Sequence, residues 1–163
     1  DLGIVTDNVD LAETDAISFA KMPALCAVPE RHPLARKKTI RPLDLQDCDF
    51  ISYEPSDMIR WGIDDLFSES GVTPQVKALV RYSVNVCTLV REQVGVGLVH
   101  PVAAYDFLKT EGIVFRRFEP GFTFHSVRIK PRTPAASAHT EALTDALDRT
   151  LAQTVADVEA QLS

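Results

Sequence analysis

The segment from Arg81 to Pro101, RYSVNVCTLVREQVGVGLVHP, combines a strand pattern, a helix pattern and a second strand pattern. The apolar residues inside it recur at helical spacing, and they are Val84, Cys87, Val90 and Val94. We expect Ser83 to cap this helix through its hydroxyl and Gly95 to end it. Short strands are expected before the helix, at 76–82, and after it, at 96–99. The segment therefore predicts two strands joined by a helix.

The tight connections of this strand–helix–strand unit indicate an α/β fold with a parallel sheet. His100-Pro101 follows the second strand, and proline is favoured in the first turn of a helix. In open sheets of this kind, ligands bind beyond the carboxyl ends of the strands, against the N-termini of helices. Ser83 and His100 both lie at such ends, so they are candidate ligand-binding residues.

Three pieces of the chain resemble the effector-binding domain of LysR-type transcription regulators. They are DLGI at 1–4, ALCAVPERHPLARKKTIRPLDLQDCDFI at 24–51 and SVNVCTLVREQVGVGLVHP at 83–101. In that family a serine or threonine opens the helix of the third piece, and the ligand lies against the N-terminus of that helix. The most specific motif is HPLA at 32–35. The chain departs from the family pattern at Gln93, where a glycine is usual.

The resemblance implies an α/β fold similar to that of type 2 periplasmic binding proteins, in which crossing strands join two Rossmann-like subdomains. Residues 25–113 would form the second subdomain. Residues 1–24 would be part of the first subdomain, and residues 114–163 would supply its return strands and C-terminal helix. The chain would be truncated at its N-terminal side, because in the family two strand–helix units and a winged helix-turn-helix precede the DLGI strand. The first subdomain is therefore expected to be incomplete.

The resemblance also implies an effector in the cleft between the subdomains. The expected ligand-binding residues lie near strand ends and helix starts, and they are Ser52, Tyr53, Ser56, Ser83, Asn85 and His100. Ser83 and Asn85 would offer hydroxyl, amide and backbone N–H groups to a ligand carboxylate. His100 would favour an acidic or uncharged part of the ligand. Three structural alternatives stay open: capping for Ser83, capping for His100 and packing for Tyr53.

The remaining elements follow from periodicity and breakers. Ser56 is expected to cap a helix that ends at Gly71, and the apolar face of this helix contains Ile59, Ile63, Leu66 and Phe67. Trp61, the single tryptophan, is expected to pack in the core or in an interface. A strand at 17–28 is interrupted at Pro23. A long C-terminal helix has one apolar face, formed by Leu143, Leu147, Leu151, Val155, Val158 and Leu162.

The composition, with 45% apolar and 25% charged residues, is that of a soluble globular protein. The net charge of −6 argues against nucleic-acid binding by this part of the protein alone, since phosphate contact needs a basic surface. No apolar run is long enough to span a bilayer. The cysteines Cys26, Cys48 and Cys87 lack metal-ligand spacing, so we expect reduced thiols in the core of a cytoplasmic protein.

The sequence contains no catalytic motif of the GxSxG, glycine-rich phosphate-loop or HExxH kind. Ser83 and His100 could be imagined as a nucleophile and its base, but no carboxylate is placed to orient the histidine. The acidic stretch 6–16 lacks the glycine and the terminal glutamate of a calcium-binding loop. We therefore expect no enzyme activity, no metal and no cofactor.

The residues and the resemblance together predict the effector-sensing domain of a LysR-type regulator, which binds a small carboxylate or amino-acid-like molecule. The expected partners are further copies of the chain, as dimers or tetramers, and DNA through a helix-turn-helix domain absent from this sequence. RNA polymerase is an expected partner of the full protein, and no membrane is involved. Regulators of opine and amino-acid catabolism are the subgroup that the chain resembles most. Two alternatives stay open: a periplasmic solute-binding protein of a transporter, and a stand-alone α/β enzyme.

Overall fold

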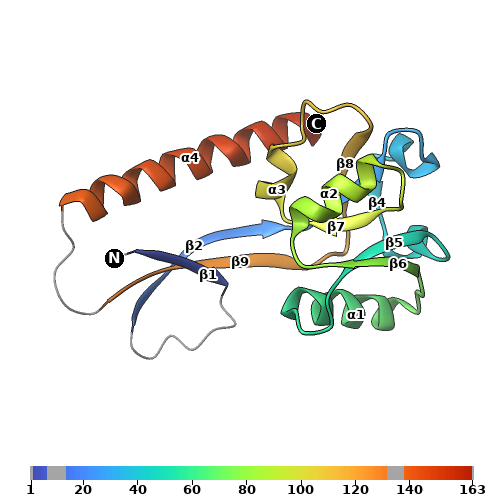
Figure 1. The fold of residues 1–163 in the computed structure, drawn as a ribbon, viewed down its shortest axis with the longest axis horizontal. Coiled ribbons are helices and arrows are strands. Elements are labelled where there is room, and N and C mark those ends of the chain that lie inside the picture. The colour runs from blue at the N-terminus through green and yellow to red at the C-terminus, as the bar shows by residue number, and fades with distance from the viewer. Residues whose placement is uncertain (1, 7–13, 132–137, 163) are drawn as a thin grey trace.

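The computed structural model describes residues 2–6, 14–131 and 138–162, and within them the strands form three sheets (Figure 1). The first is antiparallel, in the order β1-β9-β2, from β1 (Gly3–Thr6), β2 (Thr14–Pro23) and β9 (Thr123–Pro131). The second has the order β4-β8-β3-β7, from β3 (Leu25–Pro29), β4 (Thr39–Ile40), β7 (Gly97–Val99) and β8 (Ile113–Phe118). The third is a parallel pair of β5 (Asp49–Tyr53) and β6 (Gln75–Val80).

Four α-helices lie in the described residues: α1 (Met58–Ser70), α2 (Ser83–Arg91), α3 (Pro101–Tyr105) and α4 (Ala138–Leu162). Two short 3-10 helices, η1 (Pro33–Arg36) and η2 (Pro42–Leu45), follow β3 and β4. The expected α/β class is confirmed, because strands and helices alternate from β5 to α3. The predicted strand–helix–strand unit is β6, α2 and β7. Parallel pairing is also present, since β5 pairs with β6 and Phe50 bridges to Val96 in parallel.

The chain passes twice between the three-stranded sheet and the rest of the molecule (Figure 1). The first crossing leads from β2 to β3, and Pro23 is the last residue of β2, so the predicted interruption of this strand is confirmed. The second crossing leads from β8 to β9. The backbone N–H of Ala24 donates to the carbonyl of Phe122 at 2.9 Å. The two crossings therefore lie side by side and form the junction between the two parts.

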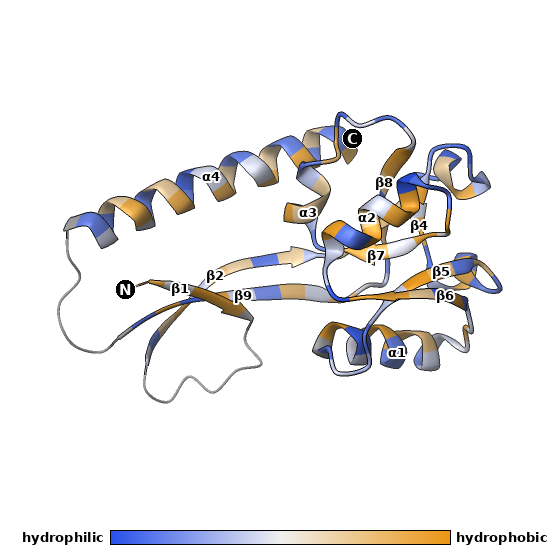
Figure 2. Cartoon of the chain, in the orientation of Figure 1, coloured by the Kyte–Doolittle hydropathy of each residue, from blue (hydrophilic) through white to orange (hydrophobic). Residues whose placement is uncertain are grey.

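The hydrophobic core surrounds β3, β5 and β7 and is covered by α1 and α2. Figure 2 shows apolar residues along β5, β6 and β7. The predicted apolar face of α1 is confirmed, since Ile63 and Phe67 are buried against this core. Trp61 lies on the other side of α1 and is 54% exposed, so packing in the core is excluded for it. Its indole N–H donates to the carbonyl of Pro55.

Helix α2 approaches β7 closely because Gly97 has no side chain. A Cβ at Gly97 would collide with the side chain of Val86 on α2. Glycine at this position therefore lets the helix pack directly on the strand.

The predicted boundaries of α1 and α2 need correction. Helix α2 ends at Arg91 rather than at Gly95, and Gln93 takes the positive φ of 65° that follows it. Gln93 thus adopts the backbone conformation for which glycine is usual. Helix α1 is capped by Asp57, whose carboxylate accepts from the N–H of Ile59, rather than by Ser56.

Helix α4 runs along the three-stranded sheet (Figure 1), to which the ion pair between Arg128 of β9 and Asp148 attaches it. A second ion pair, between Arg117 and Glu159, attaches α4 to β8 of the four-stranded sheet. Its predicted apolar face is only partly covered: Val158 is buried, but Leu143 is 51% exposed. Apolar side chains on the sheet are also exposed, and they include Ile4 and Ile17. Much of the acidic stretch 6–16 lies outside the described residues.

Candidate functional site

A connected set of hydrogen bonds joins β5, α2 and β7 at the start of α3. The Tyr53 hydroxyl donates to the carbonyl of Leu98 at 2.9 Å and lies 2.6 Å from the hydroxyl of Ser83. The backbone N–H of His100 donates to the same Ser83 oxygen at 3.2 Å. Tyr53 is fully buried, and burial raises the pKa of its phenol, so the hydroxyl remains protonated. Three of the expected ligand-binding residues are therefore brought together: Tyr53, Ser83 and His100.

The direction of each bond follows from counting protons. A carbonyl only accepts, so the single hydroxyl proton of Tyr53 is used on Leu98. The short contact between Tyr53 and Ser83 must then use the Ser83 proton. Ser83 has no further proton and already accepts from His100. Its hydroxyl therefore cannot donate to a ligand carboxylate without breaking this arrangement.

The structure also corrects the expected capping role of Ser83. Tyr82 is the N-cap residue of α2, with extended backbone angles, and Ser83 is the first residue inside the helix. The Ser83 side chain bonds to neighbouring elements instead of the first turn of its own helix. Ser83 is thus a link between β5 and the start of α3.

The ring of His100 is held in one orientation. Its Nδ1 accepts from the backbone N–H of Val102 at 3.1 Å, which confirms the capping alternative for this residue. The ring packs against Phe124, with ring centroids 4.6 Å apart. Burial lowers the pKa of His100 to about 4, because desolvation disfavours the charged imidazolium. The imidazole is neutral near pH 7.

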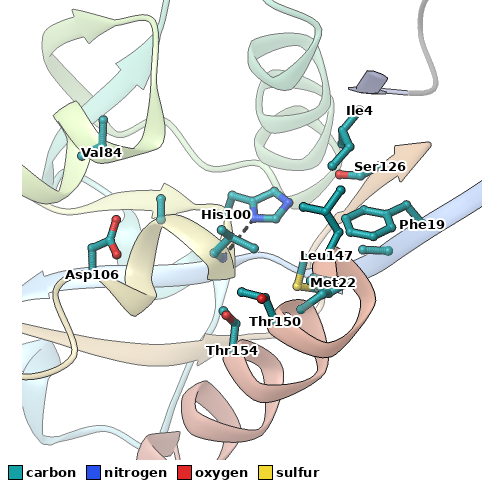
Figure 3. Close-up of a pocket in the computed structure, with 14 residues that line it drawn as sticks. Ile4, Phe19, Met22, Val84, His100, Asp106, Ser126, Leu147, Thr150 and Thr154 are labelled. Carbon is teal, nitrogen blue, oxygen red and sulfur yellow. Dashed lines mark hydrogen bonds between the residues drawn. The ribbon is translucent and has the colours of Figure 1, made fainter. Parts of the chain in front are cut away.

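A cavity of about 500 Å³ lies between α3, α4 and the three-stranded sheet, and His100 is on its wall (Figure 3). Its apolar lining comes mainly from β1, β2, α3 and α4 and includes Ile4, Phe19, Met22, Val102 and Leu147. The polar lining residues are His100, Asp106, Ser126, Thr150 and Thr154. Val84 lines the same cavity from the first turn of α2. The cavity is therefore apolar, with a few polar groups that could orient a ligand.

The other expected ligand-binding residues lie elsewhere. Ser52 and Tyr53 are neighbours on β5, so their side chains point to opposite faces of the strand. Ser52 is buried and lines a second cavity, of about 430 Å³, together with Arg60 and Asp64 of α1. Ser56 and Asn85 are exposed, and neither lines the two cavities. Of the six expected residues, only His100 lines the first cavity and only Ser52 lines the second.

Several lining residues were missed by the sequence analysis. Thr150 and Thr154 reach the cavity from α4, and Phe124, which does not line the cavity, packs against the ring of His100. Asp106 lies just beyond α3, and in the sequence alone it resembles an ordinary solvated carboxylate. No local pattern singles out Phe124, Thr150 or Thr154, because they come close to His100 only through the return of the chain along β9 and α4.

The remaining chemical groups give no sign of a reactive centre in the part of the chain that the structure describes. No group of three or more His, Cys, Asp or Glu residues there could hold a metal ion. Burial raises the pKa of Cys87 to about 12 and also raises the pKa of Cys26. Cys48 is only half-buried. No helix within the described ranges is both long and apolar enough for a transmembrane span.

The crossings, the sheets on either side of them and the cavity define a ligand-binding α/β domain. The chain belongs to the LysR substrate-binding domain family, whose model matches residues 1–152. The transcriptional activator protein LysR of Escherichia coli (strain K12) is 32% identical over 163 residues, which cover 100% of this chain and 52% of that protein. Regulatory protein NocR of Agrobacterium tumefaciens (strain T37) is 28% identical over 131 residues, covering 80% of this chain and 43% of that protein. The chain thus spans about half the length of the curated relatives it matches.

Solved structures show the same fold. The regulatory domain of Synechocystis PCC6803 CcmR in complex with 2-PG has a TM-score of 0.70 and 19% identity, over 92% of this chain and 73% of that chain. The effector binding domain of QuiR in complex with shikimate has a TM-score of 0.69 and 21% identity, over 92% of this chain and 71% of that chain. The resemblance to LysR-type regulators and the expected fold are confirmed.

Proposed function

We propose that this chain senses a small effector for a LysR-type transcription regulator and binds it in the cavity beside His100. One observation carries the proposal. The cavity lies where the three-stranded sheet meets α3, directly beside the two chain crossings, so a ligand there contacts elements from both sides of the junction. Such a ligand would shift the relative positions of the two parts if it bound one of their arrangements more tightly than another.

The effector is a small carboxylate or amino-acid-like molecule. Shikimate, which is bound in the QuiR domain, is itself a small carboxylate. The residues described around the cavity include no cation, so a carboxylate would be held by N–H and hydroxyl donors. Asp106 is the one charged lining residue among them, and its carboxylate is a suitable partner for a ligand amino group.

The division of the chain into 1–24, 25–113 and 114–163 is part of the proposal. The exposed apolar residues on the three-stranded sheet and α4 support a larger first subdomain, since a contiguous apolar surface normally packs against further protein. Leu143 and Ile17 are each at least half exposed, and β1 is at the edge of its sheet. Further polypeptide of the regulator would cover these residues and close the open side of the cavity.

For the whole protein, we propose a cytoplasmic homo-oligomer that binds DNA through a helix-turn-helix domain and contacts RNA polymerase. The relationship to regulators of opine and amino-acid catabolism is the narrowest form of this proposal. The family is regulatory, which supports a role without catalysis and without a cofactor. A periplasmic solute-binding function is not favoured, because the matched family and relatives are regulators.

The test is ligand screening on the intact regulator by thermal unfolding, with amino acids and small mono- and dicarboxylates. A ligand that binds only the folded protein raises its free energy of unfolding in proportion to RT ln(1 + [L]/Kd). Asp106→Asn should weaken an amino-bearing hit, whereas Asp65→Asn, which changes an exposed carboxylate on α1, should not. Hits should also change binding to operator DNA. A hit whose affinity is unchanged by substitutions in the cavity lining would contradict the proposed site.

A further inference from the structure

We propose that His100 selects effectors by donating a hydrogen bond from Nε2 to an oxygen acceptor of the ligand. The acceptor is a carbonyl, an ether or hydroxyl oxygen, or a carboxylate. This inference rests on the proposed function and narrows the chemistry of the ligand at one point of the cavity.

The orientation of the His100 ring supports this role. Nδ1 accepts from the N–H of Val102, and the backbone N–H of His100 is bonded to Ser83. A half-turn of the ring would place a carbon atom opposite the Val102 N–H and lose the cap of α3. Figure 3 shows the ring directed away from that cap, toward Ile4 and Ser126. Nε2 is therefore held on the cavity side.

The protonation of Nε2 follows from the bond at Nδ1. A neutral imidazole carries one N–H proton. A ring nitrogen that accepts a hydrogen bond from a backbone N–H does not carry that proton. The proton is thus on Nε2, and this nitrogen is a donor. Among the described residues, the hydrogen bonds of His100 use its backbone N–H, its carbonyl and Nδ1, and none uses Nε2.

An unpaired donor in a mostly apolar cavity discriminates strongly between ligands. A ligand oxygen placed there gains a hydrogen bond, whereas an isosteric apolar group leaves the desolvated N–H unpaired. Because His100 is neutral, it acts by the position of its N–H and not by charge. A positively charged group is disfavoured at this point, since it has no lone pair to accept the bond.

Two substitutions separate the cap from the donor. His100→Asn keeps an oxygen near the position of Nδ1, and asparagine is a good N-cap residue, but its side chain is too short to reach the place of Nε2. His100→Gln keeps an N–H donor at the longer reach and gives up the cap geometry. A purely structural role predicts that the asparagine variant behaves as the wild type.

The probes are 4-fluoroacetophenone and its isostere 4-fluoro-α-methylstyrene, which differ only in a C=O or C=CH2 group. Binding of each to the intact regulator is titrated by fluorine NMR. The readout is the ratio of the alkene Kd to the ketone Kd, because the contribution of the apolar surface that both probes bury cancels in this ratio. We expect this ratio to fall about three- to tenfold in His100→Asn, the size of one net hydrogen bond, and to be largely retained in His100→Gln. Thermal melts should show that the asparagine variant is folded.

An unchanged ratio in His100→Asn would overturn the inference, and so would a failure of the ketone to bind the wild type. Both results are independent of the proposed function. That function is tested by the effector screen and the DNA response, which do not use these probes.

Discussion

Ser83→Ala should destabilise the protein by removing the hydroxyl that joins α2 to Tyr53 on β5 and to the start of α3 at His100, and Ser83→Gly should be worse. The hydroxyl makes two hydrogen bonds, to Tyr53 at 2.6 Å and from the His100 N–H at 3.2 Å. Tyr53 keeps its donor bond to Leu98, so the main loss is an acceptor for the half-buried His100 N–H. We expect a loss of about 1–3 kcal/mol in the free energy of unfolding. Because Ser83 is inside the helix, glycine should cost roughly another 0.5–1 kcal/mol.

The assay is denaturant unfolding of the intact regulator for Ser83→Ala, Ser83→Gly, Tyr53→Phe and the double variant Tyr53→Phe/Ser83→Ala. A direct bond predicts a coupling energy of about 0.5–3 kcal/mol between the two sites. Ser56→Ala, at an exposed serine, is the matched control and should stay within about 0.5 kcal/mol of the wild type. The reasoning is refuted if Ser83→Gly is as stable as the wild type, or if the coupling energy is zero.

The other predictions concern protonation, thiols and association. His100 has a folded-state pKa of about 4, below its usual 6.5, so the unfolded state binds the extra proton. Stability should therefore fall by about 2–3 kcal/mol as pH drops from 6.5 to 4; His100→Asn should reduce this loss, and an identical pH profile would contradict the assignment. Cys26 and Cys87 should react slowly with a thiol reagent because burial raises both pKa values, while the half-buried Cys48 should react before them; equal rapid labelling without denaturant would be inconsistent. The intact regulator should form dimers or tetramers, and light scattering that shows a concentration-independent monomer would count against this.

The sequence by itself determined the α/β class, the strand–helix–strand unit and the buried face of α1. These features follow from periodicity and from breakers such as Pro23, which act over a few neighbouring residues. The sequence also singled out Tyr53, Ser83 and His100, which the structure joins by hydrogen bonds. Local patterns could do this because strand ends and helix starts meet at one edge of such a sheet.

Only the tertiary structure decided what each of these side chains does. Ser83 is an acceptor and donor inside the protein because the fold brings Tyr53 of β5 and His100, at the start of α3, within hydrogen-bond distance of it. Ser52 turns to the α1 side, because alternation along β5 sends neighbouring residues to opposite faces. Phe124 meets His100 only because β9 returns beside the first crossing. Helical and strand periods define which side of an element is buried, whereas the partner across a contact depends on pairings between residues far apart in the chain, which no local pattern encodes.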